Sequence, residues 1–159
     1  MSQGGFTTPR EERYLEDYVE GAVHEYGPVS LTAEEIIEFG RKYDPQAFHT
    51  DPAAARESVY GGLIASGWQT CAVFMRLFVE GYLPGPASLG SPGVDELRWL
   101  KPVRPGDQLW ARITIQQVKP SHSKPDRGVV YSFCEMYNQT GEVVCTMLAL
   151  NLVRLREPR

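Results

Sequence analysis

The stretch from Trp68 to Glu80 constrains the fold more than any other part of the chain. Its residues are apolar on nearly every face of a helix, and Gly81 is suited to cap the helix end. A membrane span needs roughly 18 or more apolar residues, and Arg76 interrupts this shorter stretch. We therefore expect a buried helix that is covered on all sides, most simply by a sheet.

The C-terminal half has the alternation of strands from which such a sheet can form. From residue 109 to residue 116, small or aliphatic residues alternate with Trp110 and three polar residues. This is the period of a strand with one buried face. A polar loop is expected over 119–128, and a turn over 138–141. The expected strands are 87–100 (interrupted at Pro92-Gly93), 109–116, 129–137 and 143–153, with 21–30 as a candidate N-terminal strand.

Two further helices are expected before the apolar one. Thr32 and Glu35 have the spacing of a capping box, which predicts a helix over 33–42 that ends near Tyr43. Asp51 followed by Pro52 predicts a very short helix with Asp51 as its N-cap.

The order of these elements indicates an α+β protein, with helices on one face of an antiparallel sheet. A curved antiparallel sheet wrapped around one long apolar helix describes a hot-dog fold. The 159 residues suit a single domain, which we place at 21–159. Residues 1–20 show little periodicity, and we expect a loosely held N-terminal arm there.

Charge and cysteine content exclude several functions. The net charge of −4 argues against a nucleic-acid partner, because a nucleic-acid-binding protein needs a basic face to neutralise the phosphates. Three widely spaced cysteines favour reduced, buried thiols over a disulfide framework or a zinc site. The polar N-terminus has no secretory signal, so a cytoplasmic protein without a membrane segment is expected. The sequence contains no phosphate-binding loop, dinucleotide fingerprint or zinc motif, so we expect neither a nucleotide cofactor nor a metal.

Asp44 and His49 form the densest candidate site. They follow a helix end and precede a capped helix, so a bent loop after Pro45 can bring both side chains to one water. An aspartate can orient or deprotonate that water while a histidine moves the second proton. On spacing alone, the alternative is an Asp-Pro turn next to an ordinary surface histidine. Asp51 is interpreted as a structural cap.

The small-residue passage 61–67 is the second candidate, with Gly62, Ser66 and Gly67 as its binding residues. Small residues that lead into a helix leave backbone N–H groups uncovered, and these can hold an oxyanion or a thioester carbonyl. The alternative is that the glycines only permit close packing. Ser66 lacks the spacing of a hydrolase nucleophile.

A small basic cluster at a strand end is formed by Arg98, Lys101 and Arg104. It can meet the phosphates of a nucleotide-bearing ligand, or it is a solvated rim. His24 and His122 have no acidic or cysteine partner at the spacing of a metal site.

Taken together, three passages resemble the MaoC-like dehydratase family, the hot-dog group of R-specific enoyl-CoA hydratases. The resemblance runs from about residue 20 to residue 154. The passages are DPQAFHTD (44–51), GGLIASG (61–67) and RWLKPVRPGD (98–107).

The resemblance implies reversible addition of water to the double bond of a trans-2-enoyl thioester. Asp44 and His49 would be the catalytic pair, and the Gly67 N–H would bind the thioester oxygen. The substrate carrier would be coenzyme A or acyl carrier protein, with coenzyme A phosphates near the basic cluster. A homodimer or a dimer of dimers is also implied.

Two departures from the family pattern concern the substrate. Ser66 stands where many of these hydratases have a histidine, and Trp68 and Gln69 add bulk and polarity at the start of the helix. We expect a pocket for a short, branched or polar acyl group. Two other functions remain open on this fold: a thioesterase, with Glu57 or Asp44 activating water, and a non-catalytic acyl-thioester binding module.

Overall fold

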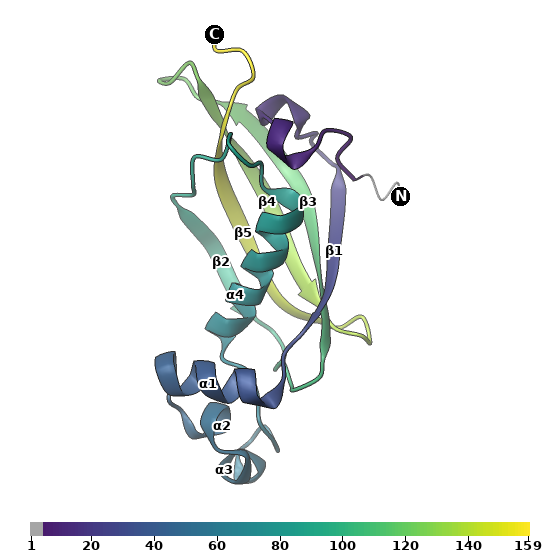
Figure 1. Cartoon of the computed structure of the whole chain (residues 1–159), viewed down its shortest axis with the longest axis vertical. Coiled ribbons are helices and arrows are strands. Elements are labelled where there is room, and N and C mark those ends of the chain that lie inside the picture. Colours follow the sequence, from purple (N-terminus) through teal and green to yellow (C-terminus); the bar gives the residue numbers. More distant parts are fainter. Residues whose placement is uncertain (1–4) are drawn as a thin grey trace.

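A five-stranded antiparallel sheet forms the body of the molecule (Figure 1). The computed structural model describes residues 5–159. The strand order is β1-β3-β4-β5-β2, so that β1 and β2 lie at the two edges. The strands are β1 (Val23–Ser30), β2 (Gly93–Trp99), β3 (Gln108–Pro120), β4 (Arg127–Tyr137) and β5 (Val143–Arg154).

The expected alternation is confirmed in β3. Leu109, Ala111, Ile113 and Ile115 are all fully buried, and their side chains form part of the core. The strand continues to Pro120, because its pairing with β4 extends as far as Pro120 opposite Gly128. The polar loop therefore spans only 121–126, which is shorter than expected.

One long helix, α4 (Gly67–Leu77), lies across the face of the sheet (Figure 1). It continues into the π-helical turn η3 (Phe78–Tyr82). The expectation that it is covered on all sides is wrong for this chain, because Trp68 and Met75 are 60% and 46% exposed. Gln69, Thr70, Phe74 and Leu77 form its buried face. Within residues 5–159, no helix has both the length and the hydropathy needed to cross a bilayer.

Three helices form a lobe at one end of the sheet: α1 (Ala33–Tyr43), α2 (Ala47–Thr50) and α3 (Pro52–Glu57) (Figure 1). The capping box at the start of α1 is confirmed, and so is the Asp51 cap of α3. The segment between them was expected as a loop, but α2 is a helical turn. A single turn is too short to show a helical period in the sequence.

The N-terminal segment is held against the sheet by two short 3-10 turns, η1 (Arg10–Glu12) and η2 (Leu15–Asp17). Leu15 is buried in the core, and the Arg13 guanidinium donates to the carbonyl oxygens of Gly81 and Tyr82 at 3.0 and 2.9 Å. The expectation of a loosely held arm over residues 1–20 is therefore wrong for residues 10–18. Residues 1–4 lie outside the described residues. The expectation failed because long-range contacts, rather than local periodicity, hold these turns. The domain boundary at residue 20 stays a prediction.

Helix α4 and the sheet together have the architecture of the hot-dog fold, as expected from the sequence. The fold places the start of α4, the end of α1 and α2 side by side, and Asp44, His49 and Gly67 lie there.

Candidate active site

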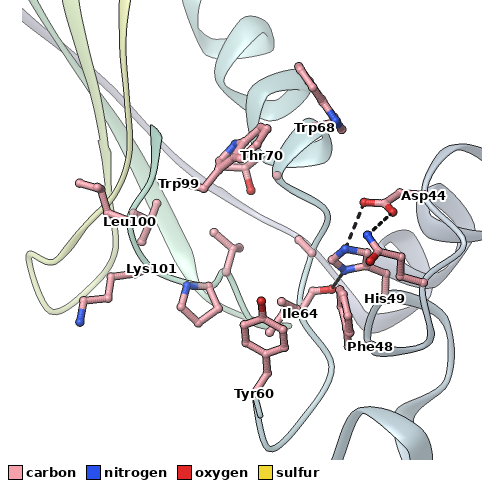
Figure 2. Close-up of a pocket in the computed structure, with 16 residues that line it drawn as sticks. Asp44, Phe48, His49, Tyr60, Ile64, Trp68, Thr70, Trp99, Leu100 and Lys101 are labelled. Carbon is pink, nitrogen blue, oxygen red and sulfur yellow. Dashed lines mark hydrogen bonds and ion pairs between the residues drawn. The ribbon is translucent and has the colours of Figure 1, made fainter. Parts of the chain in front are cut away.

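Asp44 and His49 are in direct contact (Figure 2). Asp44 is the C-cap of α1, and His49 lies in the single turn of α2. The chain bends between the two helices after Pro45, and this bend brings His49 Nε2 to 3.1 Å from Asp44 Oδ2. His49 is 4% exposed, so it is not the surface imidazole of the alternative interpretation.

A backbone carbonyl fixes the orientation of the His49 ring. Its Nδ1 lies 2.7 Å from the carbonyl oxygen of Ile64. A carbonyl oxygen can only accept, so Nδ1 carries a hydrogen and donates it. The Ile64 amide in turn donates to the Phe48 carbonyl oxygen at 3.1 Å. The passage 61–66 is thus tied to α2, and His49 presents Nε2 to Asp44.

The Asp44 carboxyl accepts hydrogen bonds on both oxygens. Gln46 Nε2 donates to Oδ1 at 2.8 Å, and the Ser66 hydroxyl donates to Oδ2 at 2.8 Å. Burial alone would raise the pKa of Asp44. Hydrogen bonds from Gln46 and Ser66, together with the charge of His49, outweigh burial and hold this pKa below its usual range.

This arrangement can exchange protons with a small molecule. Since Nδ1 of His49 is committed to Ile64, a further proton in the pair lies between Nε2 and Oδ2. The donors around Asp44 favour its carboxylate form, which can accept a proton. One member of the pair can then accept a proton while the other donates one.

Gly67, the first residue of α4, offers a free backbone donor at the cavity. Within residues 5–159, its N–H has no hydrogen-bond acceptor. The side chain of Trp99 lies directly against its Cα, and a Cβ at this position would come within 2.4 Å of Trp99 Cε2. A side chain at this position would force the indole to move, which explains why a glycine stands here. This N–H also lies at the positive end of the helix dipole.

The pair and Gly67 line one open cavity of about 490 Å³. Asp44 and His49 lie at one side of it, and Lys101 lies at the other (Figure 2). Thr70 contributes a hydroxyl from the buried face of α4. Most of the remaining lining is apolar, and it includes Phe48, Tyr60, Ile64, Trp68, Trp99 and Val144.

The other predicted site residues lie outside the lining. Ser66 is fully buried behind Asp44. Arg104 donates to the Tyr60 carbonyl oxygen at 2.5 Å, and Gly62 lies next to its guanidinium. Arg98 lies on β2 and donates to the Leu97 carbonyl oxygen. Of the basic cluster, Lys101 alone reaches the cavity, and its ammonium is 4.0 Å from Glu142.

Of the residues expected to affect substrate choice or thioester hydrolysis, one lines the cavity and two do not. Trp68 lines the cavity, whereas Gln69 donates to the Glu35 carbonyl oxygen at 3.1 Å and does not. Glu57, the candidate for thioester hydrolysis, ends α3 and does not line the cavity.

Sequence reasoning missed the role of Trp99. The residue was part of a recognised passage, but no periodicity pairs a strand-end tryptophan with a helix-start glycine 32 positions earlier. Its contact with Gly67 exists only in the folded chain. The Ser66–Asp44 hydrogen bond was missed for the same reason.

The chain shows similarity to one described family and to several known proteins. A family described as "MaoC like domain" matches residues 17–132. The "Uncharacterized protein YdeM" of Bacillus subtilis (strain 168) is 26% identical over 125 residues, covering 79% of this chain and 87% of that protein. The structure of a MaoC-like dehydratase from Rhodospirillum rubrum has a TM-score of 0.84 and 41% identity, over 91% of this chain and 99% of that one.

The R-hydratase PhaJ1 from Pseudomonas aeruginosa, in its unliganded form, is more distant. It has a TM-score of 0.71 and 23% identity, over 91% of this chain and 86% of that one. At this identity the likeness concerns the fold.

Proposed function

The chain belongs to the MaoC-like domain family, and we propose that it is a hydratase that adds water reversibly to the double bond of a trans-2-enoyl thioester. The product is an (R)-3-hydroxyacyl thioester, and the reverse reaction is its dehydration. One observation carries the proposal: Asp44 and His49 are in contact at 3.1 Å in the same cavity as the unpaired N–H of Gly67. The name of the Rhodospirillum protein agrees with this reaction.

The pair supplies both proton transfers. A water between substrate and pair gives a proton to Asp44 as its oxygen bonds to the β-carbon. His49 gives the proton on Nε2 to the α-carbon, which completes the addition of one water. The proton on Asp44 then crosses the 3.1 Å contact to His49 and restores the starting state.

Gly67 stabilises the charge that develops between these transfers. When oxygen adds to the β-carbon, electron density moves to the thioester oxygen. An N–H at the start of α4 can donate to that oxygen, and the helix dipole adds to the effect.

The substrate carrier is coenzyme A or acyl carrier protein, with its phosphate near Lys101 at the cavity edge. Arg98 and Arg104 lie farther from the cavity, and Arg104 is bound to Tyr60. We expect Lys101→Ala to raise the KM for an acyl-CoA, with Arg104→Ala having a smaller effect. Unchanged affinity in both variants would exclude the basic cluster from phosphate binding.

A second copy of the chain is the partner that the surface favours. β2 lies at an edge of the sheet, and large apolar side chains are exposed on it and on the neighbouring face of α4. We expect a homodimer or a dimer of dimers, with a mass by light scattering of at least twice 17.8 kDa. A single species of 17.8 kDa would contradict this. The exposed residues are Trp68 and Met75 on α4, Val94 and Trp99 on β2, and Leu100 directly after β2.

Crotonyl-CoA tests the reaction. Loss of the ultraviolet absorbance of the enoyl thioester reports hydration, and titration of free thiol in the same tube reports thioester hydrolysis. We expect loss of absorbance without thiol release, and a loss of about 10²–10⁴-fold in rate for Asp44→Asn.

The absorbance and thiol measurements distinguish the hydratase from a thioesterase and from a binding module. Release of thiol that depends on Asp44 would replace the hydratase by a thioesterase. No change in either channel, with retained binding of crotonyl-CoA, would indicate an acyl-thioester binding module. Glu57→Gln is a matched control, because its carboxylate lies outside the cavity and its loss should leave hydration unchanged.

A further inference from the structure

Ser66 connects the two halves of the site. Its side chain is fully buried. Its hydroxyl donates to Asp44 Oδ2 at 2.8 Å, and this is the same oxygen that lies 3.1 Å from His49 Nε2. The Ser66 oxygen also accepts the amide N–H of Trp68 at 3.3 Å, as the N-cap of α4. One hydroxyl therefore links the proton-transfer pair to the helix that presents Gly67.

We propose that Ser66 is a positioning residue that holds Asp44 as an oriented carboxylate, at a fixed place relative to the Gly67 amide. This role rests on the proposed hydration reaction and goes beyond it, since it assigns Ser66 to act through Asp44 from a fully buried position. It also replaces the substrate-binding role expected for this residue, because Ser66 does not line the cavity.

The chemistry of the hydroxyl supports this role. A hydroxyl has one hydrogen, and that of Ser66 is committed to Asp44. A donor to a carboxylate stabilises the ionised form, so the bond keeps Asp44 ready to accept a proton. As a neutral group, Ser66 does this without adding a second titrating side chain next to His49.

The other contacts of Asp44 do not duplicate this bond. The groups that contact its carboxyl are Gln46, His49 and Ser66. Gln46 is exposed and binds Oδ1, so water can replace it. Ser66 is fully buried and binds Oδ2, the oxygen that also contacts His49, so the two donors differ both in exposure and in the oxygen that they bind.

Two variants separate positioning from helix capping. Ser66→Ala removes both the donor and the N-cap, whereas Ser66→Gly removes the donor but leaves a residue that caps nearly as well. Both should lower kcat for crotonyl-CoA by roughly 10- to 100-fold with little change in KM. In both, the acidic limb of the kcat–pH profile should move to higher pH. Gln46→Ala should cause a smaller loss.

The decisive readout does not need activity. Carbon-13 NMR titration of the Asp44 carboxyl should give a higher pKa in Ser66→Gly and Ser66→Ala than in the wild type. An unchanged titration with an unmoved pH limb would overturn the proposal, as would a loss in Ser66→Ala alone. If the wild type hydrates no enoyl thioester, the proposed reaction fails, and this titration still decides whether Ser66 controls Asp44.

Discussion

Cys71 lies on α4 next to the wall of the active site. The Cys145 thiol on β5 and the side chain of Trp99, which covers Gly67, both act to lower the pKa of the Cys71 thiol. The contact with Cys145 contributes most, and together the two contacts lower the pKa of Cys71 to about 7 although burial opposes them. Burial raises the pKa of Cys134 to about 12, and the contact with Cys71 raises that of Cys145.

We therefore expect selective alkylation. The thiolate is the nucleophilic form, and Cys71 is half-buried whereas Cys134 and Cys145 are buried. Iodoacetamide at about pH 7.5 should modify Cys71 first, as read by peptide mass mapping. Trp99→Phe removes one donor and should slow this reaction. Equal labelling of Cys134 or Cys145 in the folded protein would contradict the assignment.

For single residues, the sequence identified the candidate catalytic side chains but not the contacts that hold them. Asp44 and His49 were found because an acid and a histidine flank a proline between two helices. The bonds that make them a pair run to Ile64 and Ser66, which lie 15 and 22 positions away. No local pattern reports such contacts, so the role of Ser66 came only with the fold.

Among the elements, α1 and α2 set the position of His49. Gly40 is buried in α1 at the point where α2 crosses it. A Cβ on Gly40 would lie 2.9 Å from the His49 carbonyl oxygen and 3.0 Å from its Cβ. The absence of a side chain at Gly40 is thus what lets α2 approach closely enough for His49 to reach Asp44.

Gly40→Ala should impair catalysis without touching the cavity. Alanine favours a helix by about 1 kcal/mol over glycine, but here it pushes α2 away from α1. We expect kcat for crotonyl-CoA to fall by about 10- to 100-fold, since small misplacements of a catalytic group are costly. Glu38→Ala, on the exposed face of α1, is the control and should keep the wild-type rate. Full activity of Gly40→Ala would show that α2 tolerates the shift.

Elements with end signals were the ones that the sequence predicted well. The cap at Thr32 placed α1 within a residue of its observed bounds, and the cap at Asp51 placed the start of α3 at Pro52. No such signal marks α2, η1 or η2, because each is a single turn that long-range contacts hold. The exposed stripe on α4 was missed since apolar composition does not say which side chains a sheet covers.

For the whole molecule, His24 joins the N-terminal segment to the sheet. It is 5% exposed, and its ring stacks on Phe6 with centroids 4.2 Å apart. Burial, together with the charge of Arg13, lowers the pKa of His24 below its ordinary value of 6.5. The folded chain thus binds fewer protons at this site than the unfolded chain as the pH falls below 6.5.

Stability should therefore decrease on acidification through this range. The free energy of unfolding, measured in urea, should be lower at about pH 5 than at about pH 7.5. His24→Phe keeps an aromatic ring for the stack on Phe6 but cannot be protonated, so its stability should depend less on pH. Since His49 and His122 remain in the variant, the difference from wild type isolates His24. Identical pH dependence in both proteins would contradict this account.

The central claim is that Asp44 and His49 act on one water as a unit, and a double-mutant cycle tests it most directly. The measurement is kcat for hydration of crotonyl-CoA by the wild type, Asp44→Asn, His49→Gln and the double variant. Each single change should cost about 10²–10⁴-fold, and the double variant should be no worse than the poorer single one. Losses that multiply in the double variant, or a single variant at the wild-type rate, would show that the two residues do not work as a pair.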